Sequence, residues 1–317
     1  MSVLVTGGAG FIGSHLLDRL AEEGRPAVCL DNFNDFYDPD VKRSNLSGVA
    51  SSDSIEVIEG DIRDADTCQD IFDAHEIDSV VHLAAMAGVR PSIEDPGLYE
   101  EVNCKGTVNL LDCAAEADVD RFIFGSSSSV YGGNTKIPFS EDHAVGKPIS
   151  PYAATKRSCE LFCHTYHHLY DIPMICLRFF TVYGPRQRPD LAIYKFTNLI
   201  ENDEPIPLFG DGSSKRDYTY CSDIVDGVMA SLEVDYDFEI VNLGNSRPIV
   251  LNDLVDIIQD ALGKKAKINH LPEQPGDMPV TYADISRAEE LLGYSPKYPI
   301  EKGIEDFVQW FRRNRSG

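Results

Sequence analysis

Three regularly spaced glycines near the start of the chain constrain its fold more than any other feature. Gly7, Gly10 and Gly13 follow a short apolar run at residues 3–6 and precede a helical pattern of leucines. Glycine here permits a tight turn, lets the backbone approach a pyrophosphate and lets the helix pack closely on a sheet. The start of the helix offers free N–H groups to phosphates. In this strand–loop–helix context the spacing predicts a dinucleotide-binding turn.

Apolar runs alternate with helical patterns through the first part of the chain. Strands are expected at residues 3–6, 27–30, 55–58, 79–85, 121–124 and 174–179, and long helices at 96–117 and 152–170. A long polar loop is expected at residues 32–54. Strands and helices that alternate at this period predict an α/β fold built on a doubly wound parallel sheet, the Rossmann arrangement.

The pattern changes after residue 181, where prolines separate shorter elements. Helices are expected at about 222–233, 251–262, 286–293 and 300–314. We expect a Rossmann domain at residues 1–180, with a returning segment near 217–245, and a smaller mixed C-terminal substrate-binding lobe at 181–216 and 246–317.

The second expected strand ends in an acidic residue, at the place where dinucleotide-binding folds hold the adenosine ribose. Asp31 lies 18 residues after Gly13, and its carboxylate is expected to accept hydrogen bonds from the ribose hydroxyls. A carboxylate there would repel a 2′-phosphate, so the expected cofactor is NAD rather than NADP. The alternative is an aspartate that only caps the next turn. Asp61 and Ile62, after the third strand, are expected to meet the adenine.

A tyrosine and a lysine lie one helical turn apart at the start of the expected helix 152–170. Tyr152 and Lys156 therefore share one helix face. Such a pair also arises by chance, with the lysine on the surface. A serine cluster, Ser126–Ser129, follows the fifth expected strand, and catalytic groups in parallel sheets lie at the carboxyl ends of strands. The pair and the cluster together indicate an oxidation site beside a nicotinamide. The residues expected to bind the cofactor are Gly7, Gly10, Phe11, Ile12, Asp31, Asn32, Asn34, Asp61, Ile62, Leu83, Ala84, Ala85, Tyr152 and Lys156.

The charge and the cysteines argue against several classes of function. A formal net charge of −24 makes nucleic acid and anionic membranes poor partners. No apolar run reaches the length of about 18 residues that a membrane span needs, and we expect no signal peptide. Eight scattered cysteines without a C-x-x-C pair fit free thiols in a reducing cytoplasm. His164 and His168 have helical spacing, for which a helix surface is the simpler interpretation than a metal site, and no metal is expected.

The glycine spacing, Asp31, the serine cluster and the Tyr152–Lys156 pair together resemble the extended short-chain dehydrogenase/reductase superfamily, in its sugar-nucleotide-modifying branch. The resemblance covers nearly the whole chain, because later segments match as well. Arg178–Pro185 is similar to the segment that lines the sugar pocket, Lys215–Tyr218 to the diphosphate-binding stretch, and Pro275–Asp277 to the loop on the uridine side.

Within this branch, three details resemble the UDP-glucuronate 4-epimerases. Dehydratases and decarboxylases carry an acidic residue just after the catalytic Ser or Thr, whereas this chain has Ser128 and Ser129. The segment 31–43 resembles the corresponding loop of the UDP-glucuronate 4-epimerases. Gln274 stands where UDP-galactose 4-epimerases tend to have Arg. The chain departs from the glucuronate pattern at Arg186-Gln187, where that family usually has Trp-Gly.

The resemblance implies that NAD oxidises C4 of a UDP-sugar and returns the hydride to the other face of the 4-keto sugar. Tyr152 is the implied base, and Lys156 is the cation that favours its ionised form. Ser127 is implied to bond O4, with a turn serine as the alternative. UDP-glucose, UDP-galactose and UDP-N-acetylglucosamine are alternative substrates. Alternative functions are a dehydratase, a decarboxylase or a non-catalytic NAD-binding module.

Two of the implied substrate residues have competing interpretations. Arg188 is a clamp for the sugar carboxylate, a pyrophosphate ligand or a surface residue, and Phe209 either stacks on uracil or belongs to the core. A homodimer built from the helices at 96–117 and 152–170 is implied by the same resemblance. The implied substrate-binding residues are Arg90, Ser127, Ser128, Ser129, Tyr152, Thr181, Arg188, Phe209, Arg216 and Asp277.

Overall fold

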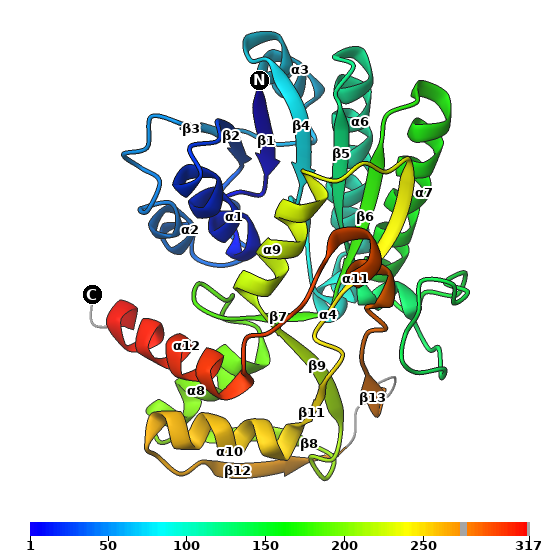
Figure 1. Cartoon of the computed structure of the whole chain (residues 1–317). Coiled ribbons are helices and arrows are strands. Elements are labelled where there is room, and N and C mark those ends of the chain that lie inside the picture. The colour runs from blue at the N-terminus through cyan, green and yellow to red at the C-terminus, as the bar shows by residue number, and fades with distance from the viewer. Residues whose placement is uncertain (273–277, 316–317) are drawn as a thin grey trace.

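A seven-stranded parallel sheet forms the centre of the molecule (Figure 1). The structure is a computed structural model that describes residues 1–272 and 278–315. The strand order is β10–β6–β5–β4–β1–β2–β3, and each neighbouring pair runs parallel. The predicted α/β fold with a doubly wound parallel sheet is therefore confirmed. The strands are β1 (Ser2–Thr6), β2 (Ala27–Asp31), β3 (Ile55–Glu59), β4 (Ile77–His82), β5 (Arg121–Ser127), β6 (Met174–Phe179) and β10 (Phe238–Leu243).

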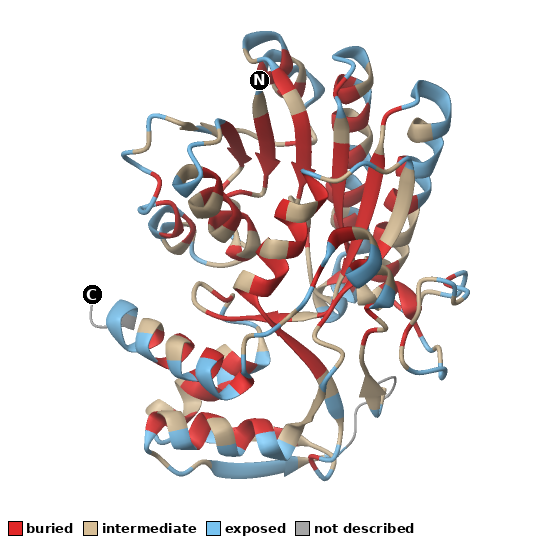
Figure 2. Ribbon diagram, in the orientation of Figure 1, coloured by how far each residue is buried: buried red, intermediate tan, exposed pale blue. Residues whose placement is uncertain are grey.

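Helices cover both faces of this sheet, and the inner strands are largely buried, whereas the edge strand β3 is partly exposed (Figure 2). One face packs against α1 (Phe11–Glu22) and α9 (Cys221–Ser231), and the other against α3 (Ala65–Ala74), α6 (Gly106–Glu116) and α7 (Pro151–Tyr170). The apolar residues of α1 recur at helical spacing, so that Leu16, Leu17 and Leu20 all enter the core. Each face thus has its own hydrophobic cluster, as a parallel sheet requires.

Two segments differ in detail from the sequence-based expectation. The expected polar loop at residues 32–54 contains a helix, α2 (Pro39–Asn45), because Asp38 caps it through Asp40 N and Pro39 opens its first turn. The expected helix at 96–117 consists of α5 (Pro96–Tyr99), a π-helical stretch η1 (Glu100–Lys105) and α6. A π-helical stretch inside a longer helix is often found at a functional site.

Smaller elements gather below the carboxyl edge of the central sheet (Figure 1). A second sheet contains β7 (Thr181–Tyr183), β9 (Lys215–Tyr220), β11 (Pro248–Val250) and β13 (Val280–Thr281), and β8 (Pro205–Phe209) pairs with β12 (Lys267–Leu271). The remaining helices are η2 (Ser128–Tyr131), α4 (Val89–Glu94), α8 (Ala192–Glu201), α10 (Leu251–Leu262), α11 (Ser286–Leu292) and α12 (Ile300–Arg315). Within the described ranges, every helix is too short or too polar to cross a membrane.

Candidate active site

A cavity of about 640 Å³ opens at the carboxyl edge of the central sheet. It lies where the strand order reverses between β1 and β4, which is the usual ligand crevice of doubly wound sheets. Its volume is within the range of small-molecule and cofactor sites. The sequence-predicted residues that line the cavity are Gly7, Gly10, Phe11, Ile12, Asp31, Asn32, Asn34, Asp61, Ile62, Leu83, Ala84, Ala85, Arg90, Ser127, Ser128, Ser129, Tyr152, Lys156, Thr181, Arg188 and Arg216.

The turn between β1 and α1 and the first turn of α1 each contain a glycine position that tolerates no side chain. Gly7 has a φ of +70°, and a Cβ there would lie 2.7 Å from Ala84 N. A Cβ on Gly13 would lie 2.3 Å from Gly7 O. Neighbouring backbone atoms therefore leave no room for a side chain at Gly7 or Gly13, and α1 begins at Phe11. This geometry fits a pyrophosphate held by backbone N–H groups at a helix N-terminus.

Asp31 is buried at the end of β2 with its carboxylate fixed by the backbone. Oδ2 accepts from Ala9 N at 3.0 Å, and Oδ1 accepts from Phe33 N at 2.9 Å. Burial raises the pKa of this carboxyl. Each oxygen still has a lone pair free, so Asp31 caps the next turn and remains able to bond ribose hydroxyls. Together with the glycine loop, this arrangement fits NAD.

Asp61 lines the cavity and belongs to a small polar network. Its Oδ2 accepts from Asn32 Nδ2 at 2.9 Å and from Arg63 Nη2 at 2.7 Å. The hydrogen bond from the Arg63 side chain is the main cause that lowers the Asp61 pKa to about 2. Asp61 is therefore an acceptor at neutral pH, which fits the predicted contact with adenine.

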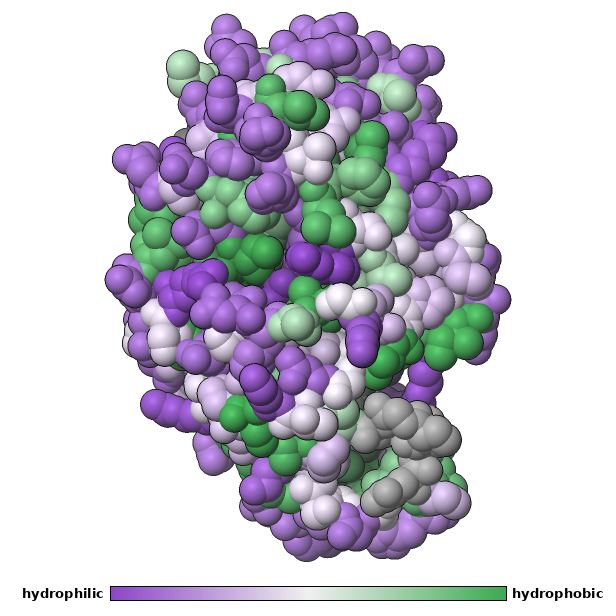
Figure 3. All heavy atoms as spheres, turned by 90° about the vertical axis from the view of Figure 1, so that its right-hand side faces the viewer, coloured by the Kyte–Doolittle hydropathy of each residue, from purple (hydrophilic) through white to green (hydrophobic). Residues whose placement is uncertain are grey.

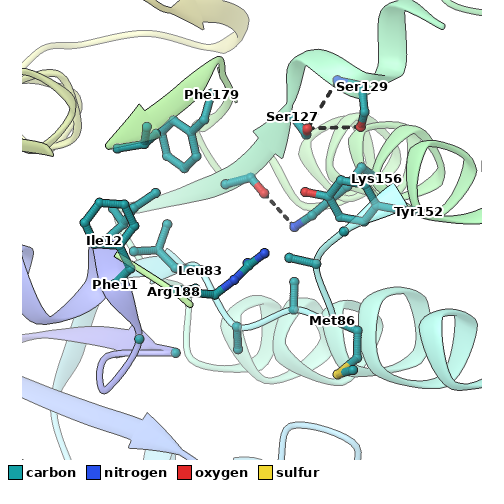
Figure 4. A pocket seen from close by; sticks show the side chains of 18 of the residues that line it. Phe11, Ile12, Leu83, Met86, Ser127, Ser129, Tyr152, Lys156, Phe179 and Arg188 are labelled. Atoms are coloured by element: carbon teal, nitrogen blue, oxygen red, sulfur yellow. Dashed lines mark hydrogen bonds between the residues drawn. The ribbon is translucent and has the colours of Figure 1, made fainter. Parts of the chain in front are cut away.

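Helix α7 brings the Tyr152–Lys156 pair to the cavity. Ser150 caps this helix through Ala153 N at 3.1 Å, and Pro151 occupies its first turn. Lys156 is buried, and its Nζ donates to Gly125 O at 2.7 Å. The pair therefore lies in the pocket wall and not on a helix surface. Figure 4 shows Tyr152, Lys156, Ser127 and Ser129 on one side of the pocket and Phe11, Ile12 and Phe179 on the other.

The serine cluster continues from β5 into the short helix η2. Ser127 Oγ accepts from Ser129 N at 3.2 Å and from Ser129 Oγ at 3.0 Å (Figure 4). With both bonds accepted, the Ser127 hydroxyl proton remains available for a further acceptor. Ser128 and Ser129 place only hydroxyls at this wall of the cavity. The site has no carboxyl group at these two positions.

Arg188 reaches into the pocket but already has an anionic partner. Its Nε and Nη2 donate to the two carboxylate oxygens of Asp190 at 2.9 and 2.8 Å, and its guanidinium lies 5.5 Å from the Phe36 ring centroid. The edge formed by Nη1 and the second N–H of Nη2 is left for a ligand. The side chain is about one-fifth exposed, so the interpretation of Arg188 as a surface residue is wrong.

Of three further residues predicted to bind the substrate, Arg216, Phe209 and Asp277, only Arg216 is found among the described residues that line the cavity. Arg216 lines the cavity, and its Nη1 donates to Met278 O at 2.7 Å and to Lys215 O at 2.9 Å. Phe209 is not among the described cavity-lining residues and lies 5.4 Å from the Arg90 guanidinium. Asp277, like Gln274, lies outside the described residues.

Sequence reasoning missed several residues of this site. Phe36, Tyr37 and Lys42 line the cavity from the segment after β2, and Lys42 Nζ donates to Asn34 O and Asn34 Oδ1, both at 2.7 Å. A lysine within a segment already matched to a cofactor-side loop was the available signal.

Asn103 had no such signal. It lies in η1. Its Oδ1 accepts a hydrogen bond from Met86 N at 2.8 Å, and its Nδ2 donates to Met86 O and to Thr155 Oγ1, both at 3.0 Å. It thereby ties the loop after β4 to α7. Among the described residues, no group of three or more His, Cys, Asp or Glu side chains is arranged to hold a metal ion.

Comparison with known proteins agrees with this geometry. Residues 4–307 match the family model of GDP-mannose 4,6 dehydratase. A UDP-glucuronate 4-epimerase of Thermodesulfobacterium geofontis is 43% identical over 312 residues, which cover 98% of this chain and 96% of that protein. The crystal structure of UDP-glucuronic acid 4-epimerase from Bacillus cereus with UDP-glucuronic acid and NAD has a TM-score of 0.93 at 37% identity, covering 99% of this chain and 100% of the other. A Thermotoga maritima UDP-glucose 4-epimerase with UDP-glucose has a TM-score of 0.91 at 32% identity, with coverage of 99% and 100%.

Proposed function

Because the chain belongs to the GDP-mannose 4,6 dehydratase family, within the extended short-chain dehydrogenase/reductases, we propose that it is an NAD-dependent isomerase that converts UDP-glucuronate to UDP-galacturonate by inversion at C4. The observation that carries the proposal is the single cavity wall that combines Tyr152, the buried Lys156 and Ser127 with hydroxyls alone at positions 128 and 129. A site without an acidic group at these positions supports epimerisation over dehydration.

The chain's own residues divide the proton chemistry between them. Tyr152 takes the O4 proton of the sugar, and Lys156, held by the Gly125 carbonyl, supplies a cation in the same pocket wall. Ser127 donates its free proton to O4 and fixes that oxygen toward Tyr152. NAD, when bound, would supply the acceptor and then the donor of the C4 hydride. Each proton and hydride is restored, so the cofactor is unchanged after a cycle.

A glucuronate substrate adds a hazard that the cavity must control. Oxidation at C4 makes the sugar a β-keto acid, which loses carbon dioxide when the breaking bond aligns with the ketone. We assign Ser128, Ser129 and Thr181 to hold the carboxylate through hydroxyl donors. The free edge of Arg188 adds a charged donor. Arg216 and Arg90 are assigned to the diphosphate, because both are cavity-lining cations of an otherwise acidic protein.

The organisation of the protein follows from this assignment. Residues 1–180, with the returning segment near 217–245, form the NAD-binding domain of our proposal, and 181–216 with 246–317 form the substrate-binding lobe. The eight cysteines are free and buried, which supports a reducing cytoplasmic location.

A homodimer through α7 and its neighbours is also proposed. Leu161 and Leu169 of α7 are 53% and 62% exposed, and Ile93 of α4 is 63% exposed. Figure 3 views the side of the molecule on which α7 lies in Figure 1, and hydrophobic residues stand among hydrophilic ones on that face. Sedimentation of the purified protein measures whether it is a dimer.

One experiment tests the reaction. Purified protein is incubated with UDP-glucuronate and followed by NMR, with carbon dioxide and reduced cofactor measured in the same sample. We expect UDP-galacturonate to form without release of carbon dioxide or net production of NADH. Turnover of UDP-galactose without any reaction of the acid would instead assign a neutral UDP-sugar, and release of carbon dioxide would assign a decarboxylase.

A further inference from the structure

A buried ion pair lies directly behind the catalytic wall of the cavity. Glu160 of α7 and Arg178 of β6 are each 1% exposed. Arg178 Nε donates to Glu160 Oε1 at 2.8 Å, and Nη2 donates to Oε2 at 2.9 Å. Neither side chain lines the cavity. The pair must therefore act through other residues if it acts on the reaction at all.

The carboxylate of this pair holds the end of β5. Ser126 Oγ donates to Glu160 Oε1 at 2.6 Å. Ser126 stands between Gly125, whose carbonyl receives Lys156 Nζ, and Ser127, the proposed partner of O4. A single buried acceptor thus fixes the segment that supplies both the anchor of Lys156 and the position of Ser127.

The guanidinium of the same pair holds the other end of the serine segment. Arg178 Nη1 donates to Tyr131 Oη at 3.1 Å, and Tyr131 Oη donates to Asn242 Oδ1 at 2.7 Å. Tyr131 is the last residue of η2 and is buried. The residues from Ser127 to Val130 are therefore bracketed by two contacts to one ion pair, at Ser126 and at Tyr131.

The pair is a poor candidate for stability alone. Buried ion pairs lose much of their Coulomb energy to desolvation, and well-packed apolar residues often replace them without loss of stability. Burial raises the pKa of Glu160, but the hydrogen bonds and positive charge of Arg178, with the bonds from Ser126 and Arg157, together leave the pKa below its usual value. Glu160 is thus a carboxylate at neutral pH. Because a carboxylate can only accept, the Ser126 hydroxyl must donate, and the direction of this hydrogen bond is fixed.

We propose that Glu160 and Arg178 are positioning residues, which hold the segment 126–131 so that Ser127 stays aligned with Tyr152 and Lys156 while the sugar turns in the site. The proposal rests on the proposed epimerase function for its kinetic consequence. Its structural consequence is independent of that function, because loss of either bracket contact loosens the serine segment.

Two substitutions remove one bracket contact each and leave the ion pair in place. Ser126→Ala deletes the hydroxyl that donates to Glu160. Tyr131→Phe deletes the hydroxyl that accepts from Arg178 but keeps the ring, which stacks on Phe139 with 4.7 Å between the ring centroids. Ser231→Ala is the matched control, because Ser231 is fully buried and its hydroxyl bonds only Gly227 O within α9, at 2.8 Å.

Three readouts separate positioning from general destabilisation. We expect kcat to fall about tenfold in Ser126→Ala, which loses one hydrogen bond to a charged group, with KM for the UDP-sugar nearly unchanged. Tyr131→Phe should lower kcat at least as much, because it loses the bond to Asn242 Oδ1 as well as the bond from Arg178. Hydrogen exchange should accelerate about tenfold at the Ser129 amide, which bonds Ser127 Oγ. The control should share any fall in melting temperature but neither of these changes.

Unchanged exchange in both variants would overturn the proposal, and so would faster exchange with wild-type kcat. A wild-type protein that turns over no UDP-sugar would overturn the proposed function, and the exchange experiment would still decide whether the bracket holds the segment.

Discussion

Replacement of Arg188 by alanine should change the choice of substrate more than the rate of catalysis. Asp190 takes the Nε–H and one N–H of Nη2, so that Nη1 and the second N–H of Nη2 are left to meet a substrate carboxylate. A hydrogen bond to a charged group contributes about 1.5–3 kcal/mol, and sharing of the charge with Asp190 favours the lower end. At about 1.4 kcal/mol per tenfold change, Arg188→Ala should lower kcat/KM for UDP-glucuronate about 10- to 30-fold. A neutral UDP-sugar lacks the carboxylate and should lose less than about threefold.

The assay compares kcat/KM for UDP-glucuronate and for UDP-glucose in wild-type protein, Arg188→Ala and Arg188→Lys. Lysine keeps the charge but lacks the planar fork that pairs with Asp190. We expect it to restore part of the preference for the acid. Equal losses on both sugars in Arg188→Ala would refute the reasoning and would place Arg188 on the diphosphate, which the two substrates share.

Three other predictions follow from single contacts. Gly13→Ala should abolish NAD binding, measured as the cofactor content of the purified protein, because its Cβ would lie 2.3 Å from Gly7 O; a variant with wild-type NAD content would contradict the narrow-loop geometry. Asp217→Asn should lower the free energy of unfolding in urea by about 1–3 kcal/mol, because the buried carboxylate accepts three backbone N–H groups and an amide cannot accept them all; an unchanged urea midpoint would refute this. Burial raises the pKa of Asp31 and Asp217, so the stability that these two groups contribute is present below about pH 4 and is lost as the pH rises through the raised pKa. The pKa of Asp61 falls to about 2, so the stability that Asp61 contributes is present at higher pH and is lost only below about pH 4. The melting temperature should therefore be higher at mildly acidic pH than at pH 8, and a maximum at alkaline pH would reject that sign.

The parts of the fold that were predictable from the sequence rest on short-range patterns. The glycine loop, the apolar runs of the central strands and the helical spacing of Tyr152 and Lys156 each lie within a few residues of one another. Alternation of strands and helices then leaves few topologies, because parallel crossovers are right-handed and short. The helix at 39–45 was not predicted because its mostly polar residues show no apolar periodicity, although the Asp38-Pro39 start signal was present.

The parts that were not predictable depend on contacts between distant residues. Asn103 meets Met86 and Thr155 across sequence separations of 17 and 52 residues, and no local pattern marks it. The same holds for the pairing of Glu160 with Arg178. Arg188 shows a different difficulty, because its sequence position suggested a free cation, and only the folded chain places Asp190 against two of its donors.

The departure at Arg186-Gln187 has a structural meaning that bears on Arg188. Arg186 is a non-glycine residue with a φ of +65°, a strained conformation that the fold must stabilise elsewhere. Its Nη1 lies 2.7 Å from Asp18 Oδ2 on α1, and His15 of the same helix bonds Pro185 O at 2.9 Å. The segment before Arg188 is thus anchored on α1, whose first turn lines the cavity. Arg186 thereby ties the backbone before Arg188 to α1, and Arg188 itself lines the cavity. Substrate preference should accordingly be decided by the groups that face the sugar and not by the residues at 186 and 187.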